Sequence, residues 1–250
     1  MIHYKTQEEI AIMREGGQRL KKIVRELKKK IHEGMTTLSI DEEANRLIKK
    51  YGGEPSFTKV KGYFWSTCLP VNEQIVHTPP SSRVLRKGDV LTLDIGFFFL
   101  GYHTDYADTW VIGDENDRRI IDFLNIGKLT LKKAIEVAKV GNYIGDISEV
   151  IETQITKSGY FVIKQLTGHG IGKRLHEEPQ VFGFLNAPKK KTIKIKPGLT
   201  IAIEVIYSIG TEKCCREKNN SWSIVTADGS LSACFEHTVA IQEKKTLILT

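Results

Sequence analysis

The sequence lacks an apolar run long enough to cross a membrane, because the longest one, at residues 97–100, is far shorter than the roughly 20 residues of a spanning helix. The first residues carry acidic side chains and no apolar core, which is not typical of a secretory signal peptide. Cysteine is scarce, and Cys68, Cys214, Cys215 and Cys234 follow neither a CxxC spacing nor the spacing of a secreted disulfide scaffold. These absences predict a cytoplasmic protein with reduced thiols.

A strong excess of one charge is also missing. The chain has 37 Lys and Arg residues against 30 Asp and Glu residues, which gives a net charge of +7. This balance permits weak, salt-sensitive attraction to a polyanion such as the ribosome, but it does not indicate sequence-specific binding of nucleic acid. With 250 residues, of which 40% are hydrophobic, the chain has the composition of a soluble globular protein with one sizeable core.

A linker rich in Pro, Gly and Ser is absent from the middle of the chain, although the helices that we predict are duplicated. In the first half, residues 6–9 form a capping box that opens a helix ending at Gly34. Residues 39–42 open a second helix, which ends at Gly52. The second half repeats this plan, with helices predicted at residues 117–138 and 146–159.

The duplication includes two predicted strands, at residues 90–96 and 200–206. Each strand carries a carboxylate at the same distance from the glycine that precedes it, Asp94 in the first and Glu204 in the second. Several matches at nearly one offset predict two similar α+β halves related by a pseudo-twofold axis. We therefore expect one domain over residues 1–250, with an internal repeat at about 1–113 and 114–250.

Asp94 stands in an otherwise apolar strand, where an unpaired carboxylate would cost about several kcal/mol to bury. One interpretation places Thr92, Asp94 and Gly96 on the solvent face of an alternating strand. The alternative is a metal site, because buried carboxylates are neutralised, paired or bound to cations. Asp105 favours the metal site, since it follows on the return strand of a hairpin that is predicted to turn around residues 100–101.

The second half offers a matching pair of carboxylates. Glu204 is followed, after a longer connection, by Glu236, the counterpart of Asp105 in the duplication. Four carboxylates that converge from two hairpins repel one another unless cations lie between them. His169 lies between two glycines, where no side chain blocks the approach of a metal or substrate. One histidine among four carboxylates favours two divalent ions such as Mn, Fe or Co, and Zn is not excluded.

Further motifs accompany these five residues. They are Val71-Asn72-Glu73 before His77, Thr167 to Gly172, His176-Glu177-Glu178-Pro179-Gln180-Val181, and Ser232 to Thr238. With these motifs the chain resembles the type I methionine aminopeptidases over essentially all of its length. The resemblance implies the pita-bread (creatinase/aminopeptidase) fold, in which two pseudo-symmetric α/β halves surround a central antiparallel sheet. It also suggests a monomer.

The resemblance implies that all five residues ligate two divalent metal ions, with Asp105 and Glu236 bridging them. It implies a hydrolase that removes the initiator methionine from nascent proteins with a small second residue, through a metal-activated hydroxide. Glu204 would be the general base, and His77 and His176 would contact the substrate. His176 would donate a hydrogen bond to the carbonyl oxygen as negative charge develops there.

The resemblance further implies that Tyr63, Cys68 and Trp222 line a pocket for the methionine side chain. Four positions depart from the family pattern, namely Val60, Leu175, Thr78 and Val205. The first two replace larger aromatic side chains of the family and would widen the pocket. We still expect cleavage to require an N-terminal methionine followed by Ala, Gly or Ser.

Two other functions stay open at this point. The first is another pita-bread hydrolase such as an X-Pro aminopeptidase, although prolidases carry an extra N-terminal domain. The second is a non-catalytic basic binding protein of the same fold, in which we would expect a ligand to have been lost. The basic loop at Lys189–Lys191 is interpreted as a solvated turn, with ribosome docking as the functional alternative.

Overall fold

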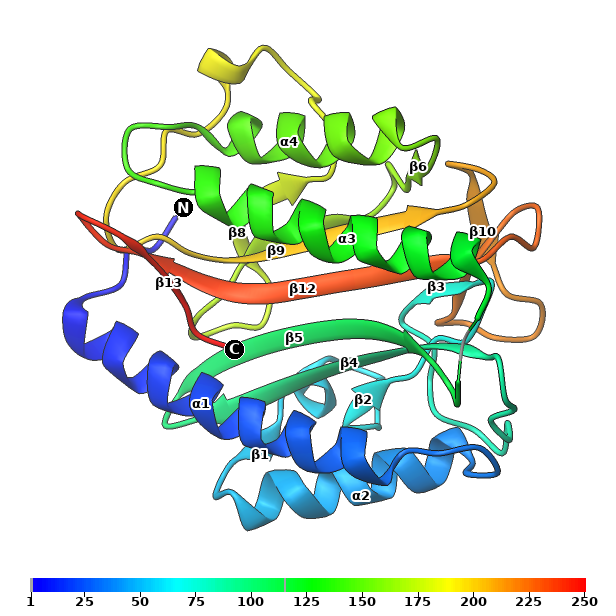
Figure 1. Cartoon of the computed structure of the whole chain (residues 1–250). Helices are drawn as coiled ribbons and strands as arrows, with labels where there is room; N and C mark the ends of the chain where they lie inside the picture. Colours follow the sequence, from blue (N-terminus) through cyan, green and yellow to red (C-terminus); the bar gives the residue numbers. More distant parts are fainter. Residues whose placement is uncertain (1, 115) are drawn as a thin grey trace.

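The computed structural model of the chain describes residues 2–114 and 116–250. Within these ranges the helices lie against a curved antiparallel sheet, with α1 and α2 beside one half of the sheet and α3 and α4 beside the other (Figure 1). The α-helices are α1 (Gln7–Lys30), α2 (Thr37–Lys50), α3 (Arg118–Val137) and α4 (Ile144–Lys157). Short 3-10 helices are η1 (Phe57–Lys59) and η2 (Lys189–Lys191).

The predicted capping box at the start of α1 is confirmed. The Thr6 hydroxyl accepts a hydrogen bond from the Glu9 amide at 3.3 Å, and the Thr6 amide donates to the Glu9 carboxylate at 2.8 Å. These two bonds satisfy backbone donors that the first helical turn leaves unpaired. The helix then buries a stripe of apolar residues against the sheet and ends at Lys30.

The start of α2 differs from the prediction. The helix begins at Thr37 rather than near Ser39, because the hydroxyl of Thr36 accepts from the Ser39 amide at 3.1 Å and so makes Thr36 the N-cap. Both residue types cap helices well, so local composition did not distinguish them. In the second half, α4 likewise begins at Ile144, two residues before the predicted Asp146.

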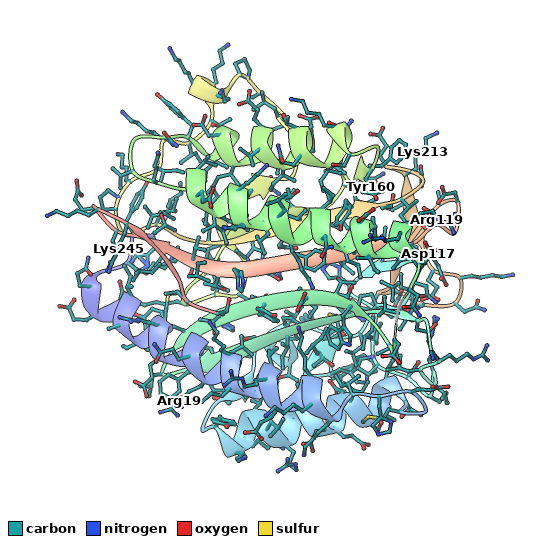
Figure 2. The ribbon with its side chains drawn as sticks, viewed as in Figure 1. Arg19, Asp117, Arg119, Tyr160, Lys213 and Lys245 are labelled. Atoms are coloured by element: carbon teal, nitrogen blue, oxygen red, sulfur yellow. The ribbon has the colours of Figure 1, made fainter. Side chains whose placement is uncertain are left out.

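The predicted start of α3 is confirmed at Asp117. Its carboxylate accepts from the Arg119 amide at 2.9 Å and also pairs with the Arg119 guanidinium at 2.8 Å. Figure 2 shows these two side chains at the end of α3 that faces the β10 side of the molecule. An acidic cap also suits the positive end of the helix dipole.

The main sheet runs in the order β1-β4-β5-β12-β9-β7-β8. In addition, β2 pairs with β4, β6 pairs with β9 and β13 pairs with β12. Its strands are β1 (Glu54–Pro55), β2 (Thr67–Cys68), β4 (Val90–Phe99), β5 (Tyr102–Val111), β6 (Phe161–Val162), β7 (Thr167–Gly170), β8 (Glu177–Phe182), β9 (Thr200–Ser208), β12 (Ser232–Ile241) and β13 (Thr246–Ile248). A smaller sheet has the order β10-β11-β3, from β10 (Cys214–Arg216), β11 (Ile224–Thr226) and β3 (Gln74–Val76).

The predicted hairpin between Asp94 and Asp105 is confirmed, although β4 extends to Phe99, beyond the expected end at Gly96. Its turn consists of Leu100 and Gly101, with φ of 47° and 89°. A two-residue hairpin turn with two positive φ angles matches the right-handed twist of the flanking strands. The hairpin therefore holds its two carboxylates on long, directly paired strands.

Alternate residues of the central strands point to opposite faces of the sheet. In β4, Leu93 and Ile95 pack into the apolar core formed with α1 and α2. In β9, Ile203 and Val205 pack into the core formed with α3 and α4. The even-numbered residues between them consequently face away from the helices, toward the open side of the sheet.

The two halves meet where β5 pairs with β12, in the middle of the sheet. Each half contributes its own helix pair and its own apolar core, in agreement with the fold class that we predicted. The division into one domain with a repeat at about residues 1–113 and 114–250 stays a prediction. In the described parts of the chain, no helix is both long and apolar enough to span a bilayer.

Candidate metal centre

One row of the sheet brings three of the predicted carboxylates together. Asp94 lies opposite Ala107 in the β4–β5 pair, Ala107 lies opposite Glu236 in the β5–β12 pair, and Glu236 lies opposite Glu204 in the β12–β9 pair. Directly opposed residues of antiparallel strands are about 4.5–5.5 Å apart and point to the same face. The three carboxylates therefore stand side by side on the open face.

The other two predicted ligands join this face by the period of two along a strand. Asp105 precedes Ala107 by two residues in β5, and His169 lies opposite Ala202, two residues before Glu204. One ligand atom each from Asp105, His169 and Glu236 lies within 4.8 Å of the other two. The alternative in which Asp94 faces bulk solvent is wrong, since Asp94 lines an internal cavity of about 130 Å³ together with the other four residues.

Crowding and burial make these carboxyl groups weak acids. Burial is the main cause that raises the pKa of Asp94, Glu204 and Glu236 well above the usual range, and the neighbouring carboxylates raise it further. Burial also raises the pKa of Asp105 to about 7. Such a cluster holds protons unless cations compensate its charge.

Two observations show that the donor set fits divalent cations. Oε1 of Glu236 is buried and has no hydrogen-bond partner among the described residues, although a buried carboxylate oxygen normally has one. The ring of His169 has Nδ1 2.8 Å from the Gly170 carbonyl, so Nδ1 carries the proton and Nε2 is free toward Glu204, 3.6 Å away. A backbone carbonyl that accepts from the other ring nitrogen in this way commonly orients metal-binding histidines.

The electrostatics of His169 agree with that assignment. Burial, assisted by the nearby His176, lowers the pKa of His169 to about 3, so the imidazole is neutral at physiological pH. A neutral imidazole is the form that binds metals. The centroids of the two histidine rings lie 4.5 Å apart at an angle of 74°.

Apolar and aromatic side chains line the cavity together with the carboxylates. Tyr63 is one of them, with its ring 5.1 Å from Trp222 in an edge-to-face contact and its hydroxyl donating to the Thr67 carbonyl at 2.7 Å. The cavity is lined by every pocket residue that the sequence predicted, namely Val60, Tyr63, Cys68, Leu175 and Trp222, with His77 and His176. The lining of the cavity therefore combines carboxylate and imidazole side chains with apolar ones.

Sequence reasoning missed two lining residues, Phe57 and Val76. Phe57 lies in η1, whose short 3-10 turn has no periodicity that would reveal an inward side chain. Val76 ends β3, directly before His77, and that adjacency was the available signal. His77 itself has a φ of 57°, uncommon for a residue other than glycine and often found at functional sites.

The four departures from the family pattern separate into two kinds. Val60 and Leu175 line the cavity. Thr78 is buried, and its hydroxyl lies 2.8 Å from that of Ser223, while Val205 packs on the helix side of the sheet. Of the four, Val60 and Leu175 thus have direct access to a bound side chain.

A wider cleft joins the cavity to the surface. It shares Val76, His77, His169, His176 and Glu204 with the cavity. Polar side chains line its outer part, and these include Gln165, Arg174, Glu178 and Gln180. A peptide can therefore place its first residue in the cavity while the following residues lie in the cleft.

The comparisons with known proteins agree with this geometry. The model of metallopeptidase family M24 matches residues 11–243. Methionine aminopeptidase 1 of Bacillus subtilis (strain 168) is 38% identical over 252 residues, covering 100% of this chain and 99% of the relative. The crystal structure of a methionine aminopeptidase from Thermotoga maritima superposes with a TM-score of 0.95 at 35% identity, and covers 100% of this chain and 99% of that one.

A more distant likeness shows the fold alone. The prolidase from Pyrococcus furiosus has a TM-score of 0.80 at 23% identity, and the match covers 99% of this chain but 65% of the prolidase. The chain therefore belongs to metallopeptidase family M24. Within this family its full-length relatives are methionine aminopeptidases, so the predicted resemblance and the pita-bread fold are confirmed.

Proposed function

We propose that this chain hydrolyses the first peptide bond of polypeptides that begin with methionine followed by a small residue such as Ala, Gly or Ser. One observation carries the proposal: four carboxylates and a histidine, side chains of the kinds that bind divalent metals, line one cavity together with apolar and aromatic side chains. The relatives that match over their full length support it. Its substrates would be the N-termini of nascent polypeptides in the cytoplasm, and the chain would act as a monomer.

Asp94, Asp105, His169, Glu204 and Glu236 would hold two divalent ions, with Asp105 and Glu236 between them. The carboxylate-rich donor set suits Mn(II), Fe(II) or Co(II), and it accepts Zn(II). When bound, such ions supply Lewis acidity that lowers the pKa of a water molecule and polarises the substrate carbonyl.

Glu204 would move the protons of the reaction. Its carboxylate lies in the row of acidic groups on the open face, and it also borders the outer cleft. Burial raises its pKa, which suits a group that takes a proton from the attacking water and delivers it to the leaving amine. Nε2 of His169 lies 3.6 Å from the Glu204 carboxylate, so one ion could contact both groups.

His77 and His176 would orient the peptide, since both border the cavity and the outer cleft. Burial lowers the pKa of both rings, so each is a neutral hydrogen-bond donor and acceptor near pH 7. His176 would donate to the carbonyl oxygen, where negative charge develops in the transition state.

The apolar lining of the cavity would select the methionine side chain. Tyr63, Cys68 and Trp222 present aromatic and sulfur surfaces, which pack well against a thioether. Val60 and Leu175 would leave room around it and broaden the accepted size by a little. An apolar slot discriminates one methylene group by only about 10- to 200-fold, so leucine should be a poor but measurable competitor.

The test is peptide cleavage by protein that has been stripped with a chelator and refilled with Mn, Fe, Co or Zn, on Met-Ala-Ser, Leu-Ala-Ser and Ala-Pro-Ala. We expect selective cleavage of Met-Ala-Ser that returns with metal and is absent in Glu204→Gln. Comparable rates on the first two peptides would contradict methionine selectivity. Preference for Ala-Pro-Ala would support an X-Pro aminopeptidase, and no cleavage with any metal would support a binding protein.

Docking to the ribosome would involve the exposed end of the basic loop. Lys189 is engaged, because its ammonium lies 2.8 Å from Glu149 and 3.4 Å from Asp146, whereas Lys190 and Lys191 are exposed. Replacing Lys190 and Lys191 with Glu should weaken cosedimentation with ribosomes, more strongly at low salt. Unchanged cosedimentation would contradict this docking site.

A further inference from the structure

The residue that follows His176 in the chain is held by a buried ion pair that the proposed reaction does not use. Nζ of Lys5 lies 2.6 Å from Oε2 of Glu177. The two side chains expose 1% and 7% of their surfaces, far less than any other lysine–carboxylate pair among the described residues. The pair connects the N-terminal segment to the first residue of β8, directly after His176, a separation of 172 residues along the chain.

On the loop side, Glu177 organises the turn that carries His176. Its Oε1 accepts from the Arg174 amide at 3.0 Å, and the Arg174 carbonyl accepts from the Gly172 amide at 3.1 Å. Although burial opposes it, these contacts hold the pKa of Glu177 below its usual value. One carboxylate thus fixes both the turn and the chain entering β8.

On the other side, Lys5 is anchored to the body of the protein. Its amide donates to the Gly198 carbonyl at 2.7 Å, just before β9, the strand of Glu204. Its ammonium also donates to the His3 carbonyl at 3.0 Å. Lys5 therefore joins the loop of His176 to the base of the strand that carries the proposed general base.

The packing around Lys5 leaves space for this one side chain. A Cβ atom on Gly172 would lie 2.3 Å from Cε of Lys5, so a larger residue there would force the end of the lysine side chain to shift. Burying two charges is costly, and apolar residues of similar size often stabilise a fold equally well. A buried ion pair at this place therefore points to a requirement for geometry rather than for stability.

We propose that Lys5 is a positioning residue that holds His176, through Glu177, where its imidazole can donate to the substrate carbonyl. Neither Lys5 nor Glu177 reaches the reacting atoms in this assignment. The inference rests on the proposed function, since it needs His176 to act on the substrate.

The test is a double-mutant cycle between Lys5→Met and His176→Ala in the metal-loaded full-length protein, with kcat and KM measured on Met-Ala-Ser. In the otherwise unchanged protein, Lys5→Met should lower kcat by roughly 10- to 100-fold, because small misplacements of a catalytic group have effects of this size. In the His176→Ala protein the same change should lower kcat by less than about twofold, because the group that Lys5 positions is already gone.

Two controls separate positioning from general damage. Lys30→Met removes a half-exposed lysine at the end of α1 that pairs with Glu43, and it should leave kcat unchanged in both backgrounds. Affinity for Mn(II), measured by calorimetry, should be the same with and without Lys5→Met, since Lys5 is not placed among the ligands. If Lys5→Met fails to fold, Lys5→Met/Glu177→Gln removes both buried charges together and enters the same cycle.

The outcomes are distinct. An equal loss of kcat in both His176 backgrounds, or a parallel loss of Mn(II) affinity, would overturn the positioning role and leave the proposed function intact. A His176→Ala protein with full activity would instead contradict the role of His176 in the proposed function. A loss confined to the background that keeps His176 would support the inference.

Discussion

The two hairpins both place two carboxylates on paired antiparallel strands, but their strands are joined by different connections. In the first, Asp94 and Asp105 are joined by the two-residue turn at Leu100 and Gly101. In the second, β9 and β12 carry Glu204 and Glu236 but are connected through residues 209–231, which include β10 and β11. The carboxylate-bearing strands are alike in the two hairpins, and the connections are not.

The long connection of the second hairpin serves the cavity. Within it, Trp222 packs against Tyr63, and β11 pairs with β3, the strand that leads into His77. The connection at residues 209–231 thus reaches the first half of the chain and contributes there to the apolar lining of the cavity. The duplicated strands therefore carry the carboxylates that we propose as metal ligands, whereas the unduplicated segment contributes Trp222 to the proposed substrate pocket.

The largest effect should come from replacing Asp105 or Glu236, the carboxylates that occupy equivalent positions in the two hairpins. Asp105→Asn and Glu236→Gln should each lower kcat/KM by more than the roughly 100-fold that the loss of a supporting hydrogen bond costs a metal site. Each change should also raise the melting temperature of the metal-free protein, because it removes a crowded acidic group. Kinetics with Mn(II) and thermal unfolding in chelator measure the two effects.

An enzyme that tolerates one of these changes but not the other would show that the halves are unequal, against the proposed bridging by both residues. A matched control is Asp108→Asn on the same β5 strand, since the Asp108 carboxylate pairs with Lys28 on the helix side. That change should leave kcat/KM within about twofold, as surface ion pairs contribute little.

The second effect is a dependence of metal-free stability on pH that both hairpins share. Burial raises the pKa of Asp105 to about 7, and burial together with the neighbouring carboxylates also raises that of Glu236. The folded protein therefore binds more protons than the unfolded chain, in which these groups titrate near pH 4. The stabilisation is fully present below about pH 4 and is lost as the pH rises through about 7.

The measurement is the melting temperature of chelator-treated protein between pH 5 and pH 8, with and without added Mn(II). We expect a fall of several degrees in chelator and a much smaller fall with metal, since ligand binding stabilises the folded state. A metal-free protein whose melting temperature rises over this range would contradict the assigned pKa directions.

The third effect concerns Trp222, which lies in the long connection of the second hairpin. Trp222→Ala should raise KM for Met-Ala-Ser by roughly tenfold, because it removes part of an apolar lining worth about 1–3 kcal/mol for a matching side chain. The substitution should change kcat less than KM, since Trp222 is not one of the proposed metal ligands. Steady-state kinetics on Met-Ala-Ser and Leu-Ala-Ser separate the two constants, and an unchanged KM would exclude Trp222 from the substrate pocket.

The smallest effect is expected from a change in the two-residue turn of the first hairpin. Leu100 is 67% exposed and adopts a φ of 47°, a conformation that asparagine tolerates better than leucine. Leu100→Asn should raise stability by about 1 kcal/mol, or about 2–4 °C in melting temperature, with no change in kcat or KM. A kinetic effect of this substitution would mean that the first connection also shapes the site.

Much of the metal centre could be predicted because it follows local rules. Carboxylates at alternating positions of apolar strands are conspicuous, and a hairpin turn brings two of them together within a dozen residues. The helices were also recognisable from their period, although Thr36 and Ser39 are equally good caps and the choice between them depends on the contacts of the preceding chain.

The parts that escaped prediction depend on contacts between distant segments. The pairing of β11 with β3 and the contact of Lys5 with Glu177 join residues more than a hundred positions apart, and no local pattern encodes them. Phe57 turns inward because its 3-10 turn packs beside Tyr63, with ring centroids 6.3 Å apart. Likewise, no local pattern shows that Val205 packs on the helix side of the sheet or that Val60, directly after η1, lines the cavity.

The unpartnered oxygen of Glu236 and its crowded acidic neighbours have a consequence for how the protein acquires its ions. A divalent ion that enters this cavity meets carboxyl groups whose pKa values are raised, so its binding favours the release of the protons that these groups hold. Loading is then an exchange of hydrogen ions for metal, and its apparent affinity strengthens as the surroundings become more alkaline. The acidity of the compartment thereby sets how much of the chain carries metal at a given supply.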